Sequence, residues 1–279
     1  MSVSVVKQSF TIGGIQTTIF KTSRAPDGSV AVVFLLHGRQ GSAEDVVSFA
    51  ASLLQKEKDV PKSRGLYVVT LDHRNHGGRT VEVRANNTWQ EKNELHAMDM
   101  YSIQVGTARD ITFLCDFLPT YLFPHDECKV DAWGVVGISL GGHSSWLALS
   151  QDPRITVGIP IIGCPDYLEL MKYRANESGV SLEAPYMPVS FFKLIKSVDP
   201  ASKEYASITA ANPFLGKKIL VLSGEKDPLV PWVASEKFVD RLEVGDGSKR
   251  VFLQKGVGHK CTEEMVSEAC SFIEAELLN

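Results

Sequence analysis

Short apolar runs alternate with amphipathic segments along most of this chain, and this alternation restricts the possible fold more than any other feature of the sequence. The run Val30–Leu36 is apolar throughout and ends at His37-Gly38, as fully buried strands do. Strand patterns, of which the first two form a predicted hairpin, cover Val3–Phe10, Ile15–Phe20, Val30–Leu36, Leu66–Leu71, Val130–Ile138, Ile155–Ile162, Lys218–Leu222 and Arg250–Gln254. Helix patterns cover Ala43–Lys58, Met98–Leu118, Leu140–Ser150, Pro231–Leu242 and Glu263–Leu278. This order predicts an α/β fold with a doubly wound, mostly parallel, eight-stranded sheet and right-handed crossovers.

Two segments interrupt the alternation. Residues 72–97 are polar and rich in turn-forming residues, and residues 165–216 separate two predicted strands. A connection as long as the second one is usually a lid or a binding element in a compact domain. Its apolar residues indicate short helices rather than disorder. We therefore expect residues 1–279 to form a single domain that carries a helical lid insertion at 165–216.

Composition argues against several classes of function. The net charge is −4 and no block of basic residues occurs, so we do not expect a nucleic acid partner. No stretch has the pattern of a signal peptide or the length of a membrane span. The five cysteines are scattered and form no C-x-x-C pair, which predicts reduced thiols, a cytoplasmic location and no metal site. The sequence leaves the oligomeric state open, a homodimer included.

The pattern G-x-S-x-G occurs at Gly137-Ile138-Ser139-Leu140-Gly141, between a predicted strand and a predicted helix. A serine on such a tight turn is held in a strained conformation with its hydroxyl exposed, and the glycines let the strand and the helix approach closely. The helix N-terminus adds backbone N–H groups near a reacting carbonyl. Ser139 is therefore the candidate nucleophile. The alternative is an ordinary glycine turn in which Ser139 caps a helix.

A serine hydroxyl needs a neighbouring base to take its proton. His259 follows the last predicted strand, and Asp227 follows the strand before it. Because active sites of doubly wound sheets lie at the carboxyl ends of the strands, we expect these side chains to meet Ser139 there. Asp227 can then accept a hydrogen bond from the imidazole of His259 and fix its tautomer. Taken singly, either residue could be an ordinary loop residue, since aspartate before proline is common in turns.

Ser139, Asp227 and His259, in this chain order, resemble the catalytic triad of the α/β-hydrolase superfamily, and the resemblance extends over essentially the whole chain. Within the superfamily the chain is most similar to prolyl-oligopeptidase-like and dienelactone-hydrolase-like esterases. It departs from the dienelactone hydrolases, which typically carry a cysteine nucleophile. The resemblance implies a serine hydrolase that cleaves an ester or a related acyl bond through an acyl-enzyme intermediate, without a cofactor.

Two further turns also resemble family motifs. The segment His37–Gly41 is similar to the H-G-x-x-G turn, which implies that the backbone N–H groups of Arg39 and Leu140 form the oxyanion hole. Gln40 is an alternative donor, and the side chain of Arg39 could instead attract a substrate carboxylate. The segment Asp72–Gly77 resembles the D-x-R-G-H-G turn, in which the histidines are scaffold residues.

A small-molecule ester is the expected partner. Aromatic and methionine side chains suggest an apolar substrate pocket, although the same residues could simply pack the insertion onto the core. The candidate substrate-binding residues are Trp89, Tyr167, Met171, Phe191 and Phe192. Two other functions remain open from the sequence: a peptidase or amidase with the same triad, and a ligand-binding receptor on a hydrolase fold.

Overall fold

The structure is a computed structural model that describes residues 4–23, 28–55 and 64–278. Its strands are β1 (Val5–Ile12), β2 (Ile15–Thr22), β3 (Ser29–Leu36), β4 (Gly65–Leu71), β5 (Lys129–Ile138), β6 (Ile155–Ile161), β7 (Lys218–Gly224) and β8 (Ser248–Gln254). Its helices are α1 (Val47–Gln55), α2 (His96–Leu122), α3 (Leu140–Gln151), α4 (Tyr167–Ser178), α5 (Val189–Val198), α6 (Val233–Arg241) and α7 (Glu263–Leu277). Val3 and positions 56–58, which the sequence placed in a strand and a helix, lie outside the described residues.

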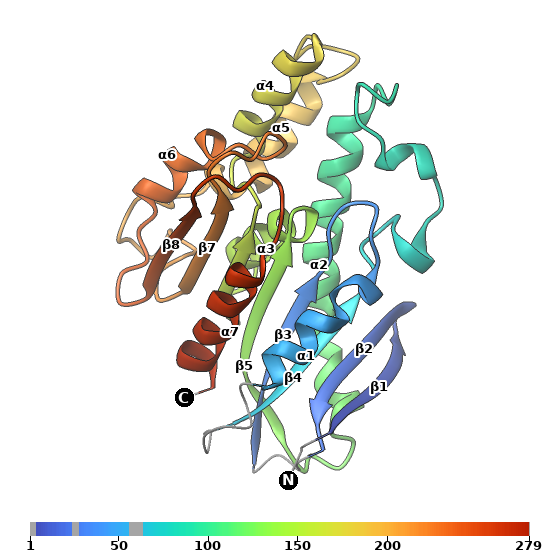
Figure 1. Cartoon of the computed structure of the whole chain (residues 1–279), viewed down its shortest axis with the longest axis vertical. Helices are drawn as coiled ribbons and strands as arrows, with labels where there is room; N and C mark the ends of the chain where they lie inside the picture. The colour runs from blue at the N-terminus through green and yellow to red at the C-terminus, as the bar shows by residue number, and fades with distance from the viewer. Residues whose placement is uncertain (1–3, 24–27, 56–63, 279) are drawn as a thin grey trace.

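The strands form one eight-stranded sheet in the order β1-β2-β4-β3-β5-β6-β7-β8 (Figure 1). The hairpin strands β1 and β2 pair antiparallel, and β2 also pairs antiparallel with β4. All the remaining neighbours are parallel. The predicted doubly wound, mostly parallel α/β sheet is therefore confirmed.

Two apolar cores lie on opposite faces of this sheet because successive side chains of a strand point to opposite sides. In β3, Val30, Val32, Phe34 and Leu36 belong to one core, which includes side chains from α2, α3 and α6. Ala31, Val33 and Leu35 belong to the other, which includes side chains from α1 and α7. Burial on both faces explains why the strand is apolar at every position from Val30 to Leu36.

The predicted helices differ from the observed ones at their ends, most clearly at the start of α1 and at the end of α2. Residues Ala43–Val46 form a 3₁₀ turn ahead of α1, with Asp45 accepting a hydrogen bond from the Ser42 backbone N–H at 2.7 Å. Helix α2 continues past Pro119 to Leu122 instead of ending at Leu118. Proline removes one helical donor, but the carbonyl of Pro119 still accepts from the N–H of Phe123 at 2.9 Å, which completes the last turn.

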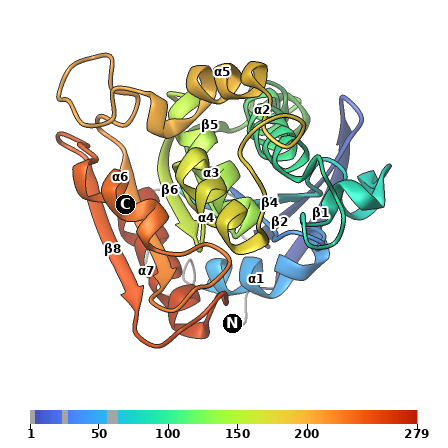
Figure 2. The same cartoon turned by 90° about the horizontal axis from the view of Figure 1, so that it is seen from above.

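The insertion at 165–216 contains the short helices α4 and α5, which lie beyond the carboxyl ends of the strands (Figure 1). Viewed from above, α4 lies over the middle of the molecule (Figure 2). Asp166 caps the start of α4 by accepting a hydrogen bond from the Glu169 N–H at 3.0 Å, and Gly179, with φ of 63°, ends it. Within the described part of the chain, no helix combines the length and the apolarity that crossing a bilayer requires.

Candidate active site

Ser139 lies on the turn between β5 and α3 in a conformation that non-glycine residues rarely adopt, with φ of 55° and ψ of −108°. Such a backbone costs about 1–3 kcal/mol and persists only where the surroundings fix it. The N–H of Ser139 donates to the carbonyl of Ile161 at 2.8 Å, and the carbonyl of Ser139 accepts from the N–H of His143 at 3.0 Å. The strained turn is thus held from the neighbouring strand and from the helix that follows.

Glycine is required on both sides of Ser139 because the chain passes very close to itself. A Cβ added at Gly137 would lie 2.2 Å from the carbonyl oxygen of Gly141, and one at Gly141 would lie 2.6 Å from the carbonyl oxygen of Leu36. These neighbours are backbone atoms, which cannot move aside as a flexible side chain does. The glycines therefore bring α3 against the sheet and fix where the hydroxyl of Ser139 lies.

The Gly137→Ala variant tests this close packing. We expect it to lower the free energy of unfolding by about 3 kcal/mol, since the added methyl group overlaps the backbone of Gly141. Urea denaturation measures the change. In Gly78→Ala, the matched control, the new methyl group meets an atom only at 3.5 Å, and we expect a change within about 0.5 kcal/mol. Equal stabilities of the two variants would contradict the role given to Gly137.

Ser139, His259 and Asp227 form one hydrogen-bonded series. The distance from Ser139 Oγ to His259 Nε2 is 2.8 Å, and the distance from His259 Nδ1 to Asp227 Oδ2 is 2.7 Å. A carboxylate can only accept, so Nδ1 carries the imidazole proton and Nε2 presents a lone pair to the serine hydroxyl. The side chain of His259 is 19% exposed, whereas that of Asp227 is wholly buried.

The backbone of its own loop holds Asp227 in place. Its second carboxylate oxygen, Oδ1, accepts hydrogen bonds from the N–H groups of Leu229 and Val230, both at 2.9 Å. Both oxygens therefore have partners, as a buried carboxylate requires. Oδ2 is thereby oriented toward His259, and the imidazole has one defined tautomer and one direction.

The turn that carries Arg39 lies next to the Ser139 turn. The carbonyl of His37 accepts a hydrogen bond from the N–H of Gly141 at 3.1 Å, which joins the two turns. Leu140 is the first residue of α3, and the N–H groups of a first helical turn have no acceptor inside their helix. For Arg39, the described residues provide no acceptor for its backbone N–H. Two backbone donors are thus available beside Ser139, one from each turn.

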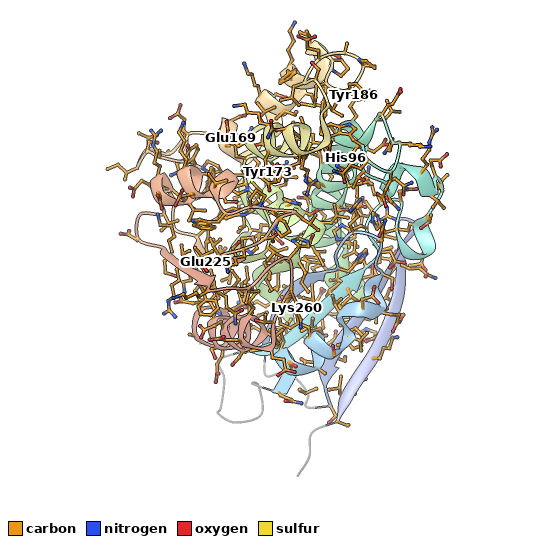
Figure 3. The ribbon with its side chains drawn as sticks, turned by 45° about the horizontal axis from the view of Figure 1, so that its top comes forward. His96, Glu169, Tyr173, Tyr186, Glu225 and Lys260 are labelled. Carbon is orange, nitrogen blue, oxygen red and sulfur yellow. The ribbon has the colours of Figure 1, made fainter. Side chains whose placement is uncertain are left out.

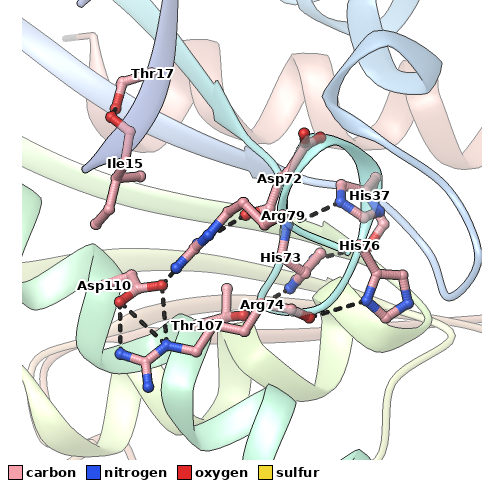
Figure 4. Close-up of polar contacts among 10 residues, drawn as sticks. All are labelled: Ile15, Thr17, His37, Asp72, His73, Arg74, His76, Arg79, Thr107 and Asp110. Atoms are coloured by element: carbon pink, nitrogen blue, oxygen red, sulfur yellow. Dashed lines mark hydrogen bonds and ion pairs between the residues drawn. The ribbon is translucent and has the colours of Figure 1, made fainter. Parts of the chain in front are cut away.

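His37, on the turn that carries Arg39, and His73 form a buried, hydrogen-bonded histidine pair (Figure 4). His37 Nδ1 donates to the carbonyl of Gly38 at 2.7 Å, so its Nε2 is the acceptor for the N–H of His73 at 3.1 Å. His73 Nε2 donates to the carbonyl of His37 at 3.0 Å, and its Nδ1 accepts from the hydroxyl of Thr107 at 2.9 Å. Each ring nitrogen has a fixed role, so both imidazoles are neutral. His73 is a scaffold residue in this geometry, as the sequence predicted.

Burial lowers the pKa of five histidines below that of a free imidazole. They are His37, His73, His76, His96 and His143. For His96 and His143 the pKa falls to about 3. Burial has the opposite effect on Asp199, whose pKa it raises well above the ordinary value. The folded protein therefore keeps these imidazoles neutral under conditions in which the unfolded chain protonates them.

Acidification should consequently destabilise the protein. Histidines of the unfolded chain bind protons below about pH 6.5 while the folded pKa values lie lower, so their contribution is complete above pH 6.5 and is lost as pH falls. Each contributes up to about 1.4 kcal/mol per pH unit. Asp199 opposes this because its raised pKa makes the folded state hold one more proton. Urea denaturation should give a free energy of unfolding at least about 2 kcal/mol lower at pH 5.5 than at pH 7.5.

The Asp199→Asn variant checks the sign of this balance, because it removes a fully buried carboxyl whose raised pKa opposes the histidines. Its stability should fall more steeply between pH 7.5 and 5.5 than that of the unchanged protein. An unfolding free energy that stays constant or rises on acidification in both proteins would contradict the account.

A cavity of about 540 Å³ opens beside Ser139 and His259. Its wall comes from the Arg39 turn, from the segment after β4, from α4 and from the loops that carry Asp227 and His259. Figure 3 looks onto this face, with His96 and Tyr173 above Lys260. Of the candidate substrate-binding residues, Trp89 lies in the wall, and His96 lies there as well.

Tyr167, Met171, Phe191 and Phe192 do not line this cavity. Tyr167 and Met171 are buried in the core, and the hydroxyl of Tyr167 donates to the carbonyl of Ala97 at 2.5 Å. Phe191 belongs to the same core, and Phe192 packs against it. The interpretation that these residues pack the insertion onto the core is the one that the structure supports.

The wall residues of α4 lie on its polar side. Leu170, Met171 and Ala175 point into the core, whereas Tyr173, Arg174, Glu177 and Ser178 line the cavity. Sequence reasoning missed the second set because it searched for apolar residues. The helical period carried the signal, since a helix that buries one side presents the other to whatever lies opposite.

Within residues 4–23, 28–55 and 64–278, no group of three or more histidine, cysteine, aspartate or glutamate side chains is arranged to hold a metal ion.

Comparison with known proteins places the chain by its fold. No protein-family profile matches it. Among curated proteins, "Putative esterase YitV" of Bacillus subtilis (strain 168) is 26% identical over 114 residues, and the aligned part covers 39% of this chain and 42% of YitV. Sequence similarity thus extends over less than half of either protein.

Solved structures match over nearly the whole chain. TT1662 from Thermus thermophilus has a TM-score of 0.69 with 19% identity and covers 98% of both chains. The acylaminoacyl peptidase of Pyrococcus horikoshii has a TM-score of 0.65 with 14% identity over all of this chain and 43% of the peptidase. The Pyrococcus furiosus esterase Pf2001 has a TM-score of 0.55 with 20% identity, over 98% and 93% of the two chains. The protein therefore has the α/β-hydrolase fold, and the resemblance inferred from the sequence is confirmed.

Proposed function

We propose that this chain is a serine hydrolase that cleaves a carboxylic ester or a related acyl bond through an acyl-enzyme intermediate on Ser139. The observation that carries the proposal is the hydrogen-bonded series from Ser139 through His259 to Asp227 at the wall of a cavity. A serine next to a neutral imidazole with a fixed tautomer is the arrangement that nucleophilic catalysis requires. The YitV and Pf2001 names support ester chemistry.

In the proposed reaction, Ser139 Oγ attacks the substrate carbonyl carbon while His259 Nε2 takes the hydroxyl proton. The backbone N–H groups of Arg39 and Leu140 donate to the oxyanion of the tetrahedral intermediate. As the bond to the leaving alcohol breaks, His259 gives its proton to the alcohol oxygen. A water molecule then attacks the acyl-enzyme, and its proton returns through His259 to Ser139 Oγ as the carboxylic acid leaves.

We further propose that residues 1–279 act as one domain and that residues 165–216 serve as a lid over the site. Support comes from α4, which contributes Tyr173 and Arg174 to the cavity wall. Shortening the loop within residues 181–185, which are mostly exposed, should change the ranking of ester substrates and leave the melting temperature within a few degrees. An unchanged ranking would contradict the lid proposal and would mean that the segment only packs against the core.

A turnover screen over p-nitrophenyl esters, lactones and aminoacyl amides tests the proposed activity. We expect multiple turnovers with at least one class of ester. A peptidase or amidase is the second candidate, supported by the likeness to the acylaminoacyl peptidase, and it predicts faster turnover of the amides. Tight binding of a ligand without turnover of any substrate would contradict the proposal and favour a receptor.

A further inference from the structure

Two arginine side chains of the Ser139 cavity differ in their ion pairs from the other partly buried arginines of the described protein. Arg64, Arg79 and Arg154 each form an ion pair with an aspartate at 3.1 Å or less. Arg174 forms no ion pair with any described residue, and its guanidinium donates only to the carbonyl of Leu229, at 3.2 and 3.3 Å. Guanidinium groups withdrawn from water usually have an anionic partner.

The guanidinium of Arg39 also lacks a close carboxylate partner. Its guanidinium donates to the carbonyl of Asn86 at 2.8 Å, and the nearest carboxylate oxygen, Glu91 Oε2, lies 3.9 Å away. That oxygen already accepts from the N–H of Thr88 at 2.7 Å and from its hydroxyl at 3.0 Å. Glu91 is half exposed, and water screens its charge. Arg39 therefore retains donors without an anionic acceptor.

The positive charges of Arg39 and Arg174 face the same cavity. Both arginines line the cavity with Ser139 and His259. Burial is the main cause that lowers the pKa of His96, and the charges of Arg174 and Arg39 lower it further. Burial also lowers the pKa of Arg174, and the charge of Arg39 acts in the same direction, whereas Tyr167, Cys164 and Asp227 partly offset them. Glu177 is the one acidic side chain among the lining residues described, and it is exposed at the rim.

We infer that the guanidinium groups of Arg39 and Arg174 form an oxoanion-binding subsite, and that the substrate carries a carboxylate or phosphate group in addition to its acyl bond. The inference rests on the proposed function for the acyl bond alone. Guanidinium forks bind the oxygens of such groups bidentately. An anion bound here would give Arg174 the ion pair that it lacks among the described residues, and would give Arg39 a closer partner than Glu91 at 3.9 Å.

Matched esters test the subsite. The p-nitrophenyl monoester of glutaric acid and p-nitrophenyl pentanoate differ mainly in a terminal carboxylate. We expect kcat/KM to favour the glutarate ester, and Arg174→Gln to lower it at least about tenfold for this ester but less than about threefold for the pentanoate. Arg39→Gln, which keeps the backbone N–H, should act in the same direction. Arg241→Gln, on the exposed end of α6, is the control and should change neither value.

Loss of rate with both esters by the same factor in Arg174→Gln would mean that Arg174 only holds α4 against the Asp227 loop, and would overturn the inference. Arg174→Lys separates the two readings further, since it keeps the charge but loses the fork. An intermediate preference is expected for it. Melting temperatures of all variants confirm that each is folded.

Binding to the Ser139→Ala variant separates this inference from the proposed hydrolysis. Calorimetry should detect binding of glutarate or inorganic phosphate, and the tighter ligand identifies the oxoanion. The Ser139→Ala/Arg174→Gln double variant should lose that binding. If no ester is hydrolysed but the anion still binds, the proposed hydrolase function fails and the subsite stands. If esters are hydrolysed without preference and neither anion binds, the subsite alone is wrong.

Discussion

Replacing Ser139 by alanine should reduce ester turnover by about 10⁴-fold or more, to the level left by substrate binding and the oxyanion donors. The variant lacks the only atom that forms the acyl bond in the proposed reaction. Its fold should persist, because the hydrogen bonds that hold the turn come from the backbone N–H and carbonyl of this residue. Steady-state kinetics with the best ester of the screen measures the loss.

Ser150→Ala is the matched control for Ser139→Ala. Ser150 lies at the far end of α3, where its hydroxyl donates to the carbonyl of Leu147 at 2.9 Å. It should retain turnover within about threefold. A loss of less than tenfold in Ser139→Ala, with the melting temperature unchanged, would remove Ser139 as the nucleophile.

Asp227→Asn should lower kcat by about 10⁴-fold while leaving the fold nearly intact. The amide oxygen of asparagine can still accept from the N–H groups of Leu229 and Val230. The amide nitrogen would then face His259 Nδ1, and because it donates, it would force the proton of the imidazole onto Nε2. Nε2 could no longer take the proton of Ser139.

KM and the melting temperature separate this effect on the tautomer from general damage to the site. Both should change little in Asp227→Asn, since the side chains have nearly the same shape. Asp240→Asn, on the exposed surface of α6, is the control and should behave like the unchanged protein. If kcat of Asp227→Asn stayed within tenfold of the original value, Asp227 would have no part in orienting His259.

The strands could be predicted from the sequence because most of them are buried on both faces. A strand such as β3 is apolar at every position from Val30 to Leu36, and no amphipathic helix has that pattern. Ser139, Asp227 and His259 could be placed for a related reason. Each follows a strand, and the carboxyl ends of parallel strands meet at one edge of the sheet. Their connection through two hydrogen bonds, at 2.8 and 2.7 Å, required coordinates.

The cavity wall could not be predicted in the same way. Aromatic residues of the insertion suggest a pocket, but burial of apolar area draws them into the core, as with Tyr167 and Phe191. The residues of the insertion that line the cavity are mostly polar ones that do not pack in the core, among them Arg174. Which side of α4 faces Ser139 depends on how the insertion docks, and the local sequence does not specify that docking.

The end of α2 shows a second limit. Proline is a reliable sign of a helix start or a break, so the predicted helix ended before Pro119. One further turn nevertheless forms, because the carbonyl of Pro119 still finds a donor in Phe123. Boundaries of this kind depend on single hydrogen bonds, to which the hydrophobic pattern is insensitive.

Reaction with a fluorophosphonate, followed by mass spectrometry of the intact protein and of its peptides, tests the central claim most directly. The reagent phosphonylates a serine whose hydroxyl proton a neighbouring base removes, and fluoride leaves as the phosphorus–oxygen bond forms. The account predicts one adduct per chain, located on Ser139, formed by the folded protein and abolished in both Ser139→Ala and His259→Ala. An adduct on a different residue, or labelling of Ser139→Ala at the original rate, would contradict it.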